Sequence, residues 1–387
     1  MKKFLKVLCI IIVAIAIIVY GGVFICHKVF FKEQISNVPT IQAATDGTFT
    51  FGVQAHPTQA QMVEEFLPVL TEQLKRYNEI ASALWPDNAV VDQSLVIEKI
   101  DNGKLWLITP DGIITPISKN EVKKLGANRN AYVDGFSFFD GGMYYAIRDI
   151  DVQNVLDWQK YLHLGTHDTI LFLTHEKFHN DEQGKWRHKD VIPNMGRGEF
   201  LENTEARAKR DLLQRQLLKA VSEPNDTRLI LDALATYEDW KVQFPEDYKN
   251  SYYFDRIEGA AYYYELVSGL YIGYPDQVKG KNDLDGALSL LATREDVYVK
   301  HGLASESYIV GGFSCVLLDR LEPDWQERLM NDPDATPIEM LLQHFKDEQL
   351  PAPKQLTKEE IGAVRWAIQE PKDVKPRLFR FIYDILF

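Results

Sequence analysis

The chain has 387 residues, of which 45% are hydrophobic and 26% are charged, a composition typical of a globular protein. Its net charge of −13 argues against a nucleic-acid partner, because contacts to phosphates need a basic surface. After residue 26 the chain holds a single cysteine, Cys315, so no disulfide can form within its body and the fold must be stabilised by its core.

The first residues differ from the rest of the chain. Lys2, Lys3 and Lys6 precede an uncharged apolar run from Val7 to Cys26. A helix of about 20 apolar residues spans the hydrocarbon core of a bilayer. The run ends without the small residues of a signal-peptide cleavage site, although cleavage stays the alternative. We therefore expect residues 1–32 to form a cytoplasmic stub and a single-pass transmembrane signal anchor, with the C-terminal domain extracytoplasmic because lysines stay inside.

The next segments predict a tether followed by one large domain. Residues 33–56 are polar and mixed, which indicates a tether, and residues 57–387 form the predicted domain. Apolar residues at helical spacing predict an amphipathic helix over 58–83. Asp-Asn-Gly and Pro-Asp-Gly turn signals then separate short runs of alternating apolar residues. These runs predict strands over 94–100, 104–110 and 112–118, and one or two more over 135–150.

Beyond Asp151 the pattern becomes helical. A short helix is predicted over 152–162, and longer helices over 202–222, 226–242, 252–272, 283–298, 304–321 and 336–347. A strand-rich N-terminal half followed by a mainly helical C-terminal half predicts an α+β fold.

The strongest chemical signal is the stretch "TILFLTHEKFHND", residues 169–181. His175 and His179 are four residues apart, so on a helix both imidazoles can point at one metal ion. Glu176 is rotated away from the ion toward its open side, where a carboxylate can take a proton from a water that zinc has activated. The helix is expected to begin at Asp168 or Thr166, to bury "ILFL", and to end near Gly184.

A catalytic zinc usually has a third protein ligand, and the sequence offers two acidic candidates. Glu258 is followed by Gly259, Ala260 and Ala261, small residues that would let its helix approach the motif helix closely. Glu205 is the alternative, but it belongs to a segment whose charges indicate a solvated face: Glu202, Glu205, Arg207, Lys209 and Arg210.

His-Glu-x-x-His followed by Glu258-Gly259-Ala260-Ala261-Tyr262-Tyr263 resembles the gluzincin branch of the zincin metallopeptidases. The resemblance covers these two helices. It implies a zincin-like fold in which His175, His179 and Glu258 bind Zn²⁺ and Glu176 activates water. The acidic residue that the family carries four positions after the third ligand is absent here, because position 262 is Tyr. The partners that orient the ligands are therefore not identified from the sequence.

Other residues are candidates for supporting roles. The oxyanion of peptide hydrolysis needs a donor, for which Tyr308 is our choice over Tyr263, Tyr264 and His188. The strand in "GGMYYAIRDI", residues 141–150, could bind substrate backbone along a sheet edge. His163 and His167 are also four apart, but Gly165 lies between them, so a structural or surface role is favoured over a second metal site.

These observations predict a membrane-anchored, zinc-dependent metallopeptidase that acts on peptide or protein substrates, with the lipid bilayer as partner of its N-terminal helix. The rival prediction is a catalytically inactive zincin-fold binding or scaffold protein tethered to the membrane. A hydrolase of other substrates that uses the same site is the third possibility, because a fold and a motif do not fix a substrate.

Overall fold

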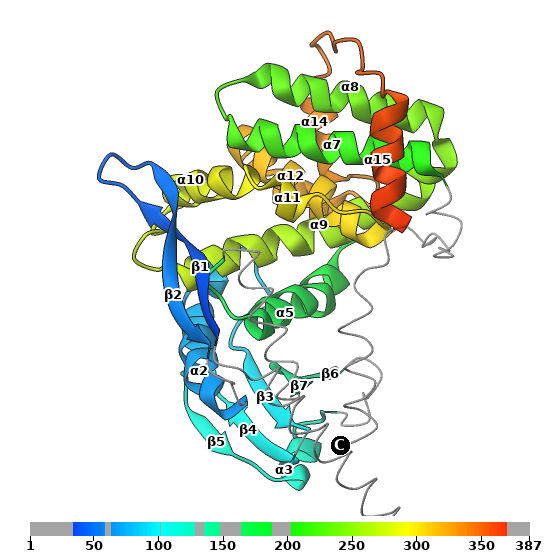
Figure 1. The fold of residues 1–387 in the computed structure, drawn as a ribbon. Coiled ribbons are helices and arrows are strands. Elements are labelled where there is room, and N and C mark those ends of the chain that lie inside the picture. The colour runs from blue at the N-terminus through cyan, green and yellow to red at the C-terminus, as the bar shows by residue number, and fades with distance from the viewer. Residues whose placement is uncertain are drawn as a thin grey trace, which may run out of the picture.

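The structure is a computed structural model that describes residues 34–58, 63–100, 102–127, 135–147, 164–187 and 203–369. It has the predicted α+β organisation, with strands in the N-terminal half and helices in the C-terminal half (Figure 1). No helix among these residues is long and apolar enough to cross a bilayer. The predicted anchor, residues 1–32, and the predicted helix 152–162 lie outside the described residues.

A five-stranded sheet forms the core of the N-terminal half, with strand order β5-β4-β3-β7-β6. Its central strands β3 and β7 are parallel, and the other neighbours are antiparallel. The strands are β3 (Ser94–Lys99), β4 (Lys104–Ile108), β5 (Ile114–Pro116), β6 (Phe136–Phe139) and β7 (Gly142–Ile147). All the strands predicted between residues 94 and 150 are therefore confirmed.

The two faces of the sheet contact different partners, as the alternation of side chains along a strand requires. Leu95 and Ile97 of β3 face the main core of the protein. Val96, between them, belongs to a smaller cluster with Val122 of α3 (Lys119–Lys124), a short helix that the sequence did not predict.

The predicted tether is a β-hairpin over its described part. β1 (Gln34–Ala43) pairs with β2 (Phe49–Thr58) in an antiparallel two-stranded sheet. The sequence did not predict this hairpin. The hairpin runs alongside the helical half (Figure 1), where Phe49 lies against Gly286.

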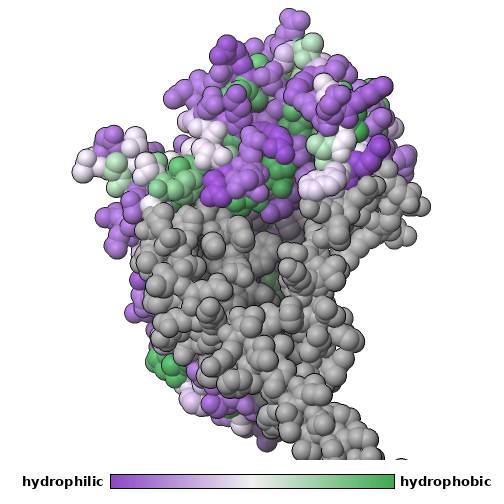
Figure 2. Space-filling model, viewed as in Figure 1, coloured by the Kyte–Doolittle hydropathy of each residue, from purple (hydrophilic) through white to green (hydrophobic). Residues whose placement is uncertain are grey.

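Helices form the C-terminal half, and helix α2 (Val63–Ile80) packs beside the sheet. The remaining helices are α7 (Thr204–Ser222), α8 (Thr227–Gln243), α9 (Pro245–Gly273), α10 (Lys281–Ala292), α11 (Glu295–Tyr298), α12 (Leu303–Leu321), α13 (Trp325–Asn331), α14 (Pro337–His344) and α15 (Lys358–Gln369). The predicted helix 283–298 is two helices, and α13 and α15 were not predicted. The outer surface of this half is mostly hydrophilic where it faces the viewer (Figure 2).

Helix α5 (Asp168–Lys177) connects the two halves. It lies between the sheet and α9 (Figure 1), and Phe172 on its sheet side packs against Phe136 and Tyr145. Ile170, Leu171 and Leu173 are buried, as predicted for the start of the motif helix. The motif helix is therefore held on both sides by the core.

Candidate metal centre

The helix that carries the motif has an unusual course. His167, rather than Asp168 or Thr166, is its N-cap residue, and the His167 side chain accepts a hydrogen bond from the backbone N–H of Thr169. After Lys177 the α-helix continues as a π turn over Phe178–Glu182 and a 3₁₀ turn over Gln183–Lys185. Single π turns inside helices are often found at functional sites.

The two motif histidines face each other across this change in helix type. His175 lies in the α-helical part and His179 in the π turn. Their Nε2 atoms are 3.1 Å apart and their ring centroids 4.7 Å apart. The predicted convergence of both imidazoles on one point is therefore present in the structure.

Glu258 of α9 completes the group. Its Oε2 atom is 3.5 Å from Nε2 of His175 and 3.3 Å from Nε2 of His179. His175, His179 and Glu258 are the group that could hold a metal ion, with ligand atoms all within 4.8 Å of one another. Glu205 is exposed in the first turn of α7 and is not part of this group.

The spacing of the three atoms fits zinc. Two ligand atoms that each lie about 2.0–2.1 Å from a tetrahedral ion are about 3.3–3.4 Å from each other. The three observed separations of 3.1, 3.3 and 3.5 Å bracket that value. Two neutral imidazoles and one carboxylate are also the donors that zinc takes in catalytic sites.

Gly259, the first small residue after Glu258, does not have the predicted role. We expected Gly259 to let α9 approach the motif helix, but a Cβ atom on Gly259 would collide with the backbone of Gly311 and Gly312 in α12. Gly269, further along α9, is the glycine that lies against Leu171 of α5. Gly259 therefore brings α9 into backbone contact with α12, directly beside the ligand Glu258.

Each histidine has a partner on its other ring nitrogen. Nδ1 of His175 is 2.9 Å from Oε2 of Glu265, and Nδ1 of His179 is 2.6 Å from Oε1 of Gln183. The Nε2 atom of Gln183 donates to the carbonyl of Ile257, so Oε1 of Gln183 accepts a hydrogen bond from the Nδ1–H of His179. Both contacts favour a proton on Nδ1, so in the neutral rings Nε2 is the atom available to a metal ion; without a metal, Nε2 can carry a second proton that it donates to Glu258.

Sequence reasoning missed both of these partners. The acid was sought at position 262, one turn after Glu258, but Glu265 lies two turns after it on the same helix. Residues seven apart also share a helix face, and that spacing was the available signal. Gln183 lies four residues after His179, a spacing that places two side chains on one helix face, so this partner also had a signal in the sequence.

The charges of the site shift the pKa values of its members. Burial would lower the pKa of His175, but the carboxylates of Glu258 and Glu265 outweigh burial and raise it to about 10. Burial would raise the pKa of Glu258, but hydrogen bonds from His175 and His179 lower it to about 2. The site therefore attracts positive charge strongly, whether that charge is a proton or a metal ion.

Glu176 lies beside the cluster without being one of its three ligands. It is partly buried, and burial raises its pKa, while the nearby charges of His175 and His179 oppose that rise. A carboxylate whose pKa is raised is a better proton acceptor near neutral pH. Its position and its pKa both agree with the role that the sequence predicted.

Tyr308 is the tyrosine candidate that reaches the site. Its ring lies with its centroid 5.5 Å from that of His175 and stacks on Tyr262 at 5.6 Å. Burial raises the pKa of Tyr308, as do the negative charge of Glu258 and a hydrogen bond with it, so the phenol keeps its proton. Tyr263 and Tyr264 bond elsewhere, to Asp319 and to Tyr77 and Asn88.

Other expected residues are not at the site or cannot be placed. The strand predicted to bind substrate, β7, is paired on both sides, and β6 is the edge strand of the described sheet at that end. The edge prediction for β7 is therefore wrong. His167 is buried as the helix cap, and burial lowers its pKa to about 3, which agrees with a structural role. His163 and His188 lie outside the described residues.

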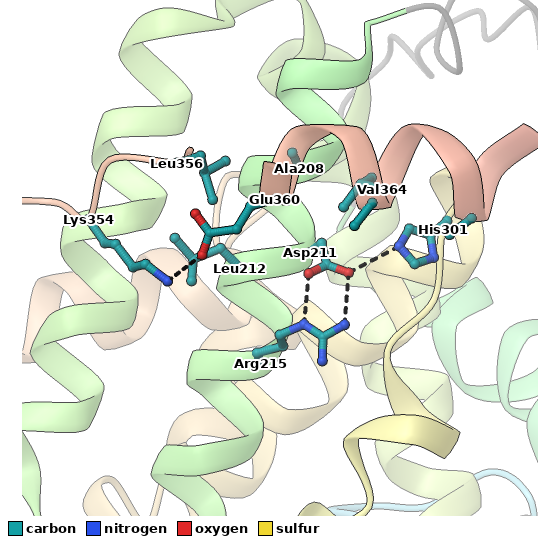
Figure 3. A pocket seen from close by; sticks show the side chains of 11 residues that line it. Ala208, Asp211, Leu212, Arg215, His301, Lys354, Leu356, Glu360 and Val364 are labelled. Atoms are coloured by element: carbon teal, nitrogen blue, oxygen red, sulfur yellow. Dashed lines mark hydrogen bonds and ion pairs between the residues drawn. The ribbon is translucent and has the colours of Figure 1, made fainter. Parts of the chain in front are cut away.

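A separate pocket of about 240 Å³ lies between α7 and α15. Its charged side chains pair with one another: Asp211 with Arg215 and His301, and Lys354 with Glu360 (Figure 3). The opposite charges in this pocket bind each other. The pocket therefore lacks a set of metal-ligand atoms that converge on one point, as at His175, and we assign no ligand to it.

Comparison of the chain with family models, with curated proteins and with solved structures found no match.

Proposed function

We propose that the chain is a zinc-dependent metallopeptidase with a gluzincin-like site. The observation that carries the proposal is the convergence of His175 Nε2, His179 Nε2 and Glu258 Oε2 at separations suited to tetrahedral zinc. The zincin-like fold is part of the proposal, and α5 with α9 supports it by supplying these three groups from two helices.

The residues of the chain divide the chemistry between them. His175, His179 and Glu258 would hold the ion, which when bound supplies Lewis-acid polarisation of the scissile carbonyl and lowers the pKa of a water. Glu176 takes the proton of the attacking water on its carboxylate and passes it to the nitrogen of the leaving amine. Tyr308 donates a hydrogen bond from its phenolic hydroxyl to the oxyanion that forms on the substrate.

Membrane attachment remains part of the proposal on sequence grounds. The apolar run Val7–Cys26 supports a transmembrane anchor, and the lysines before it support an extracytoplasmic domain. Protease protection on intact cells measures the orientation. Full digestion of the domain by external protease is expected, and its complete protection would reverse the proposed topology.

Metal analysis of the full chain in detergent tests the ligand assignment. We expect about one zinc per chain in the wild type and loss of that zinc in His175→Ala/His179→Ala. His344→Ala is the matched control, because His344 pairs with Glu322 far from the cluster. Zinc that stays stoichiometric in the double variant would exclude the two histidines as ligands.

Hydrolysis of a quenched fluorescent peptide library tests the enzymatic role. Glu176→Gln is expected to keep its zinc and to lose activity by about 10²–10⁴-fold, the range for a general base. Glu205→Gln, an exposed acid on α7, is the control and keeps wild-type activity. Full activity in Glu176→Gln would exclude its role, and zinc-loaded wild type that cleaves nothing would favour the binding or scaffold protein.

A further inference from the structure

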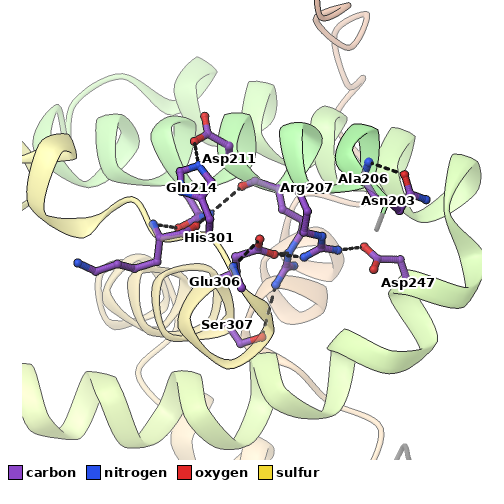
Figure 4. A network of polar contacts seen from close by, with 12 residues as sticks. Asn203, Ala206, Arg207, Asp211, Gln214, Asp247, His301, Glu306 and Ser307 are labelled. Carbon is purple, nitrogen blue, oxygen red and sulfur yellow. Dashed lines mark hydrogen bonds and ion pairs between the residues drawn. The ribbon is translucent and has the colours of Figure 1, made fainter. Parts of the chain in front are cut away.

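A network of buried ions lies behind the candidate site, in a place where a solvated surface was predicted. Arg207 and Arg210 of α7 are both 0% exposed, so the prediction of a solvated face is wrong for them. Arg207 pairs with Glu306 of α12 and Asp247 of α9 (Figure 4). The network therefore joins three helices through side chains that are shielded from water.

Arg210, like Arg207, extends from α7 to both α9 and α12. Its two terminal nitrogens donate to the carboxylate of Asp255 on α9, at 2.9 and 2.5 Å. One of them is also 3.5 Å from Oγ of Ser307 on α12, and Ser307 donates to Asp255 at 2.7 Å. A planar guanidinium that grips a carboxylate with two bonds fixes orientation as well as distance.

The partners of Arg210 are neighbours of residues that form the candidate site. Asp255 lies one helical turn before Glu258 on α9. Ser307 is adjacent in sequence to Tyr308 on α12. Arg210 therefore binds the two helices immediately beside the metal ligand and the phenol.

The helices α9 and α12 are also in unusually close contact there. A Cβ atom on Gly311 would collide with the carbonyl oxygen of Asp255, and one on Gly259 would collide with Gly311. With no side chains between the two backbones, a small slide of one helix would move Tyr308 relative to Glu258. The Arg210–Asp255–Ser307 contact opposes such a slide, because each bond in it is directional.

We propose that Arg210 is a positioning residue for the candidate site: through Asp255 and Ser307 it fixes α9 against α12 and so holds Tyr308 at Glu258. The inference rests on the proposed function for its catalytic consequence, but the placement of Tyr308 can be measured without activity. Ordinary stabilisation is a weak explanation for the network, since buried ion pairs often add little net stability over apolar packing.

Two pairs of variants in the full chain separate positioning from general stabilisation. Arg210→Lys keeps the charge but loses the two-pronged grip on Asp255. Arg215→Lys is its control, because Arg215 lies on the same helix and also binds one carboxylate with two nitrogens, that of Asp211, but at the pocket beside α15. Ser307→Ala removes one hydroxyl, and its control is Ser314→Ala, a buried serine of α12 whose hydroxyl has no partner among the described residues.

Fluorine NMR of protein labelled with 3-fluorotyrosine reads the position of Tyr308 without metal or substrate. The resonance is assigned by its loss in Tyr308→Phe. We expect Arg210→Lys and Ser307→Ala to shift it, and Arg215→Lys and Ser314→Ala to leave it unchanged. An unmoved Tyr308 resonance in folded Arg210→Lys would overturn the proposal. If Arg210→Lys does not fold by circular dichroism, Ser307→Ala, which keeps every charge, decides the question by the same criterion.

Kinetics then test the consequence for catalysis. Arg210→Lys is expected to lower kcat at least about ten-fold with KM changed less than about two-fold, since misplacement of a group by about 1 Å can cost 10²-fold. Wild-type kcat in a variant whose Tyr308 resonance has shifted would overturn the catalytic part. A shifted resonance in a protein whose wild type hydrolyses nothing would instead refute the proposed function and leave the positioning role standing.

Discussion

Two polar clusters meet on α9, and they are built in opposite ways. The network around Arg210 joins α7, α9 and α12, whereas the cluster around His175 joins α9 to α5 and its π turn. In the network around Arg210, cations and carboxylates alternate, so each charge contacts its opposite. In the cluster around His175, two imidazoles and a carboxylate point lone pairs at one another. Side chains alone offset most of the charge in the first arrangement, whereas the second needs a positive charge at its centre.

That difference separates a structural use of buried charge from a chemical one. The histidine cluster can take its positive charge as a proton, because the neighbouring carboxylates raise the pKa of His175 to about 10. It can also take that charge as a divalent ion, for which the proton must leave. A candidate metal site thus differs from a structural ion network because several electron-pair donors converge on one point; burial or charge alone does not make that difference.

Removing the carboxylate from the histidine cluster should have the largest effect. Glu258→Gln keeps the size of the side chain but removes the anionic ligand, so we expect zinc affinity to fall at least about 100-fold, beyond the 10–100-fold typical of lost outer partners. Competition with a chromogenic chelator measures it. Glu205→Gln, which alters the rival candidate, is expected to bind zinc as the wild type does, and the reverse pattern would transfer the ligand role to Glu205.

Separating α9, which carries Glu258, from α12, which carries Tyr308, should come next. Gly259→Ala puts a methyl group into the backbone contact with Gly311, and we expect about 2–3 kcal/mol of lost stability, within the range for overpacked cores. Gly362→Ala is the matched control, because that helical glycine has nothing within 4 Å and alanine there should stabilise by up to about 1 kcal/mol. Urea unfolding measures both, and equal effects would show that α9 and α12 can move apart freely.

The smallest effect should come from pH acting on the ion network. Arg207 and Arg210 face three carboxylates, those of Asp247, Asp255 and Glu306, so one negative charge is in excess when all are ionised. Burial raises the pKa of Glu306 to about 7, although both arginines oppose the rise. In the folded protein Glu306 therefore keeps its proton up to about pH 7. In the unfolded chain, where the pKa of glutamate is near 4.5, Glu306 loses that proton at lower pH.

The stability that this proton provides is fully present below about pH 4.5 and is lost as the pH rises through about 7. We expect the wild type to lose on the order of 2 kcal/mol from this group between pH 5 and 8, and Glu306→Gln, which mimics the protonated form, to remove that dependence. Urea unfolding across this range is the measurement. A dependence unchanged in Glu306→Gln would show that another group titrates.

The motif residues could be predicted because their geometry is local. His175 and His179 converge through the repeat of a single helix, and "TILFL" before them indicated a buried helix. The strands were predictable for the same reason, since alternation and turn residues act over a few positions. Glu258 was chosen from the small residues that follow it and from the resemblance to a known pattern, and neither is a rule of helix geometry.

The remaining errors concern contacts between distant segments. The charges of Arg207 and Arg210 look like those of a solvated helix, and only the carboxylates of α9 and α12 make their burial tolerable. Gly259 was assigned to the wrong neighbour, because a glycine in a helix can indicate a close contact with another element but does not identify that element. The hairpin β1–β2 was missed because its sequence does not alternate clearly between apolar and polar residues.

The amide of Gln183 gives the candidate centre an asymmetry. It joins His179 to the backbone of Ile257, whereas His175 is joined to the carboxylate of Glu265. The amide is neutral, whereas the carboxylate brings a negative charge to its histidine as well as orientation. One imidazole is thus fixed by geometry alone and the other by geometry together with charge, so the two ligands of one ion need not hold it equally tightly.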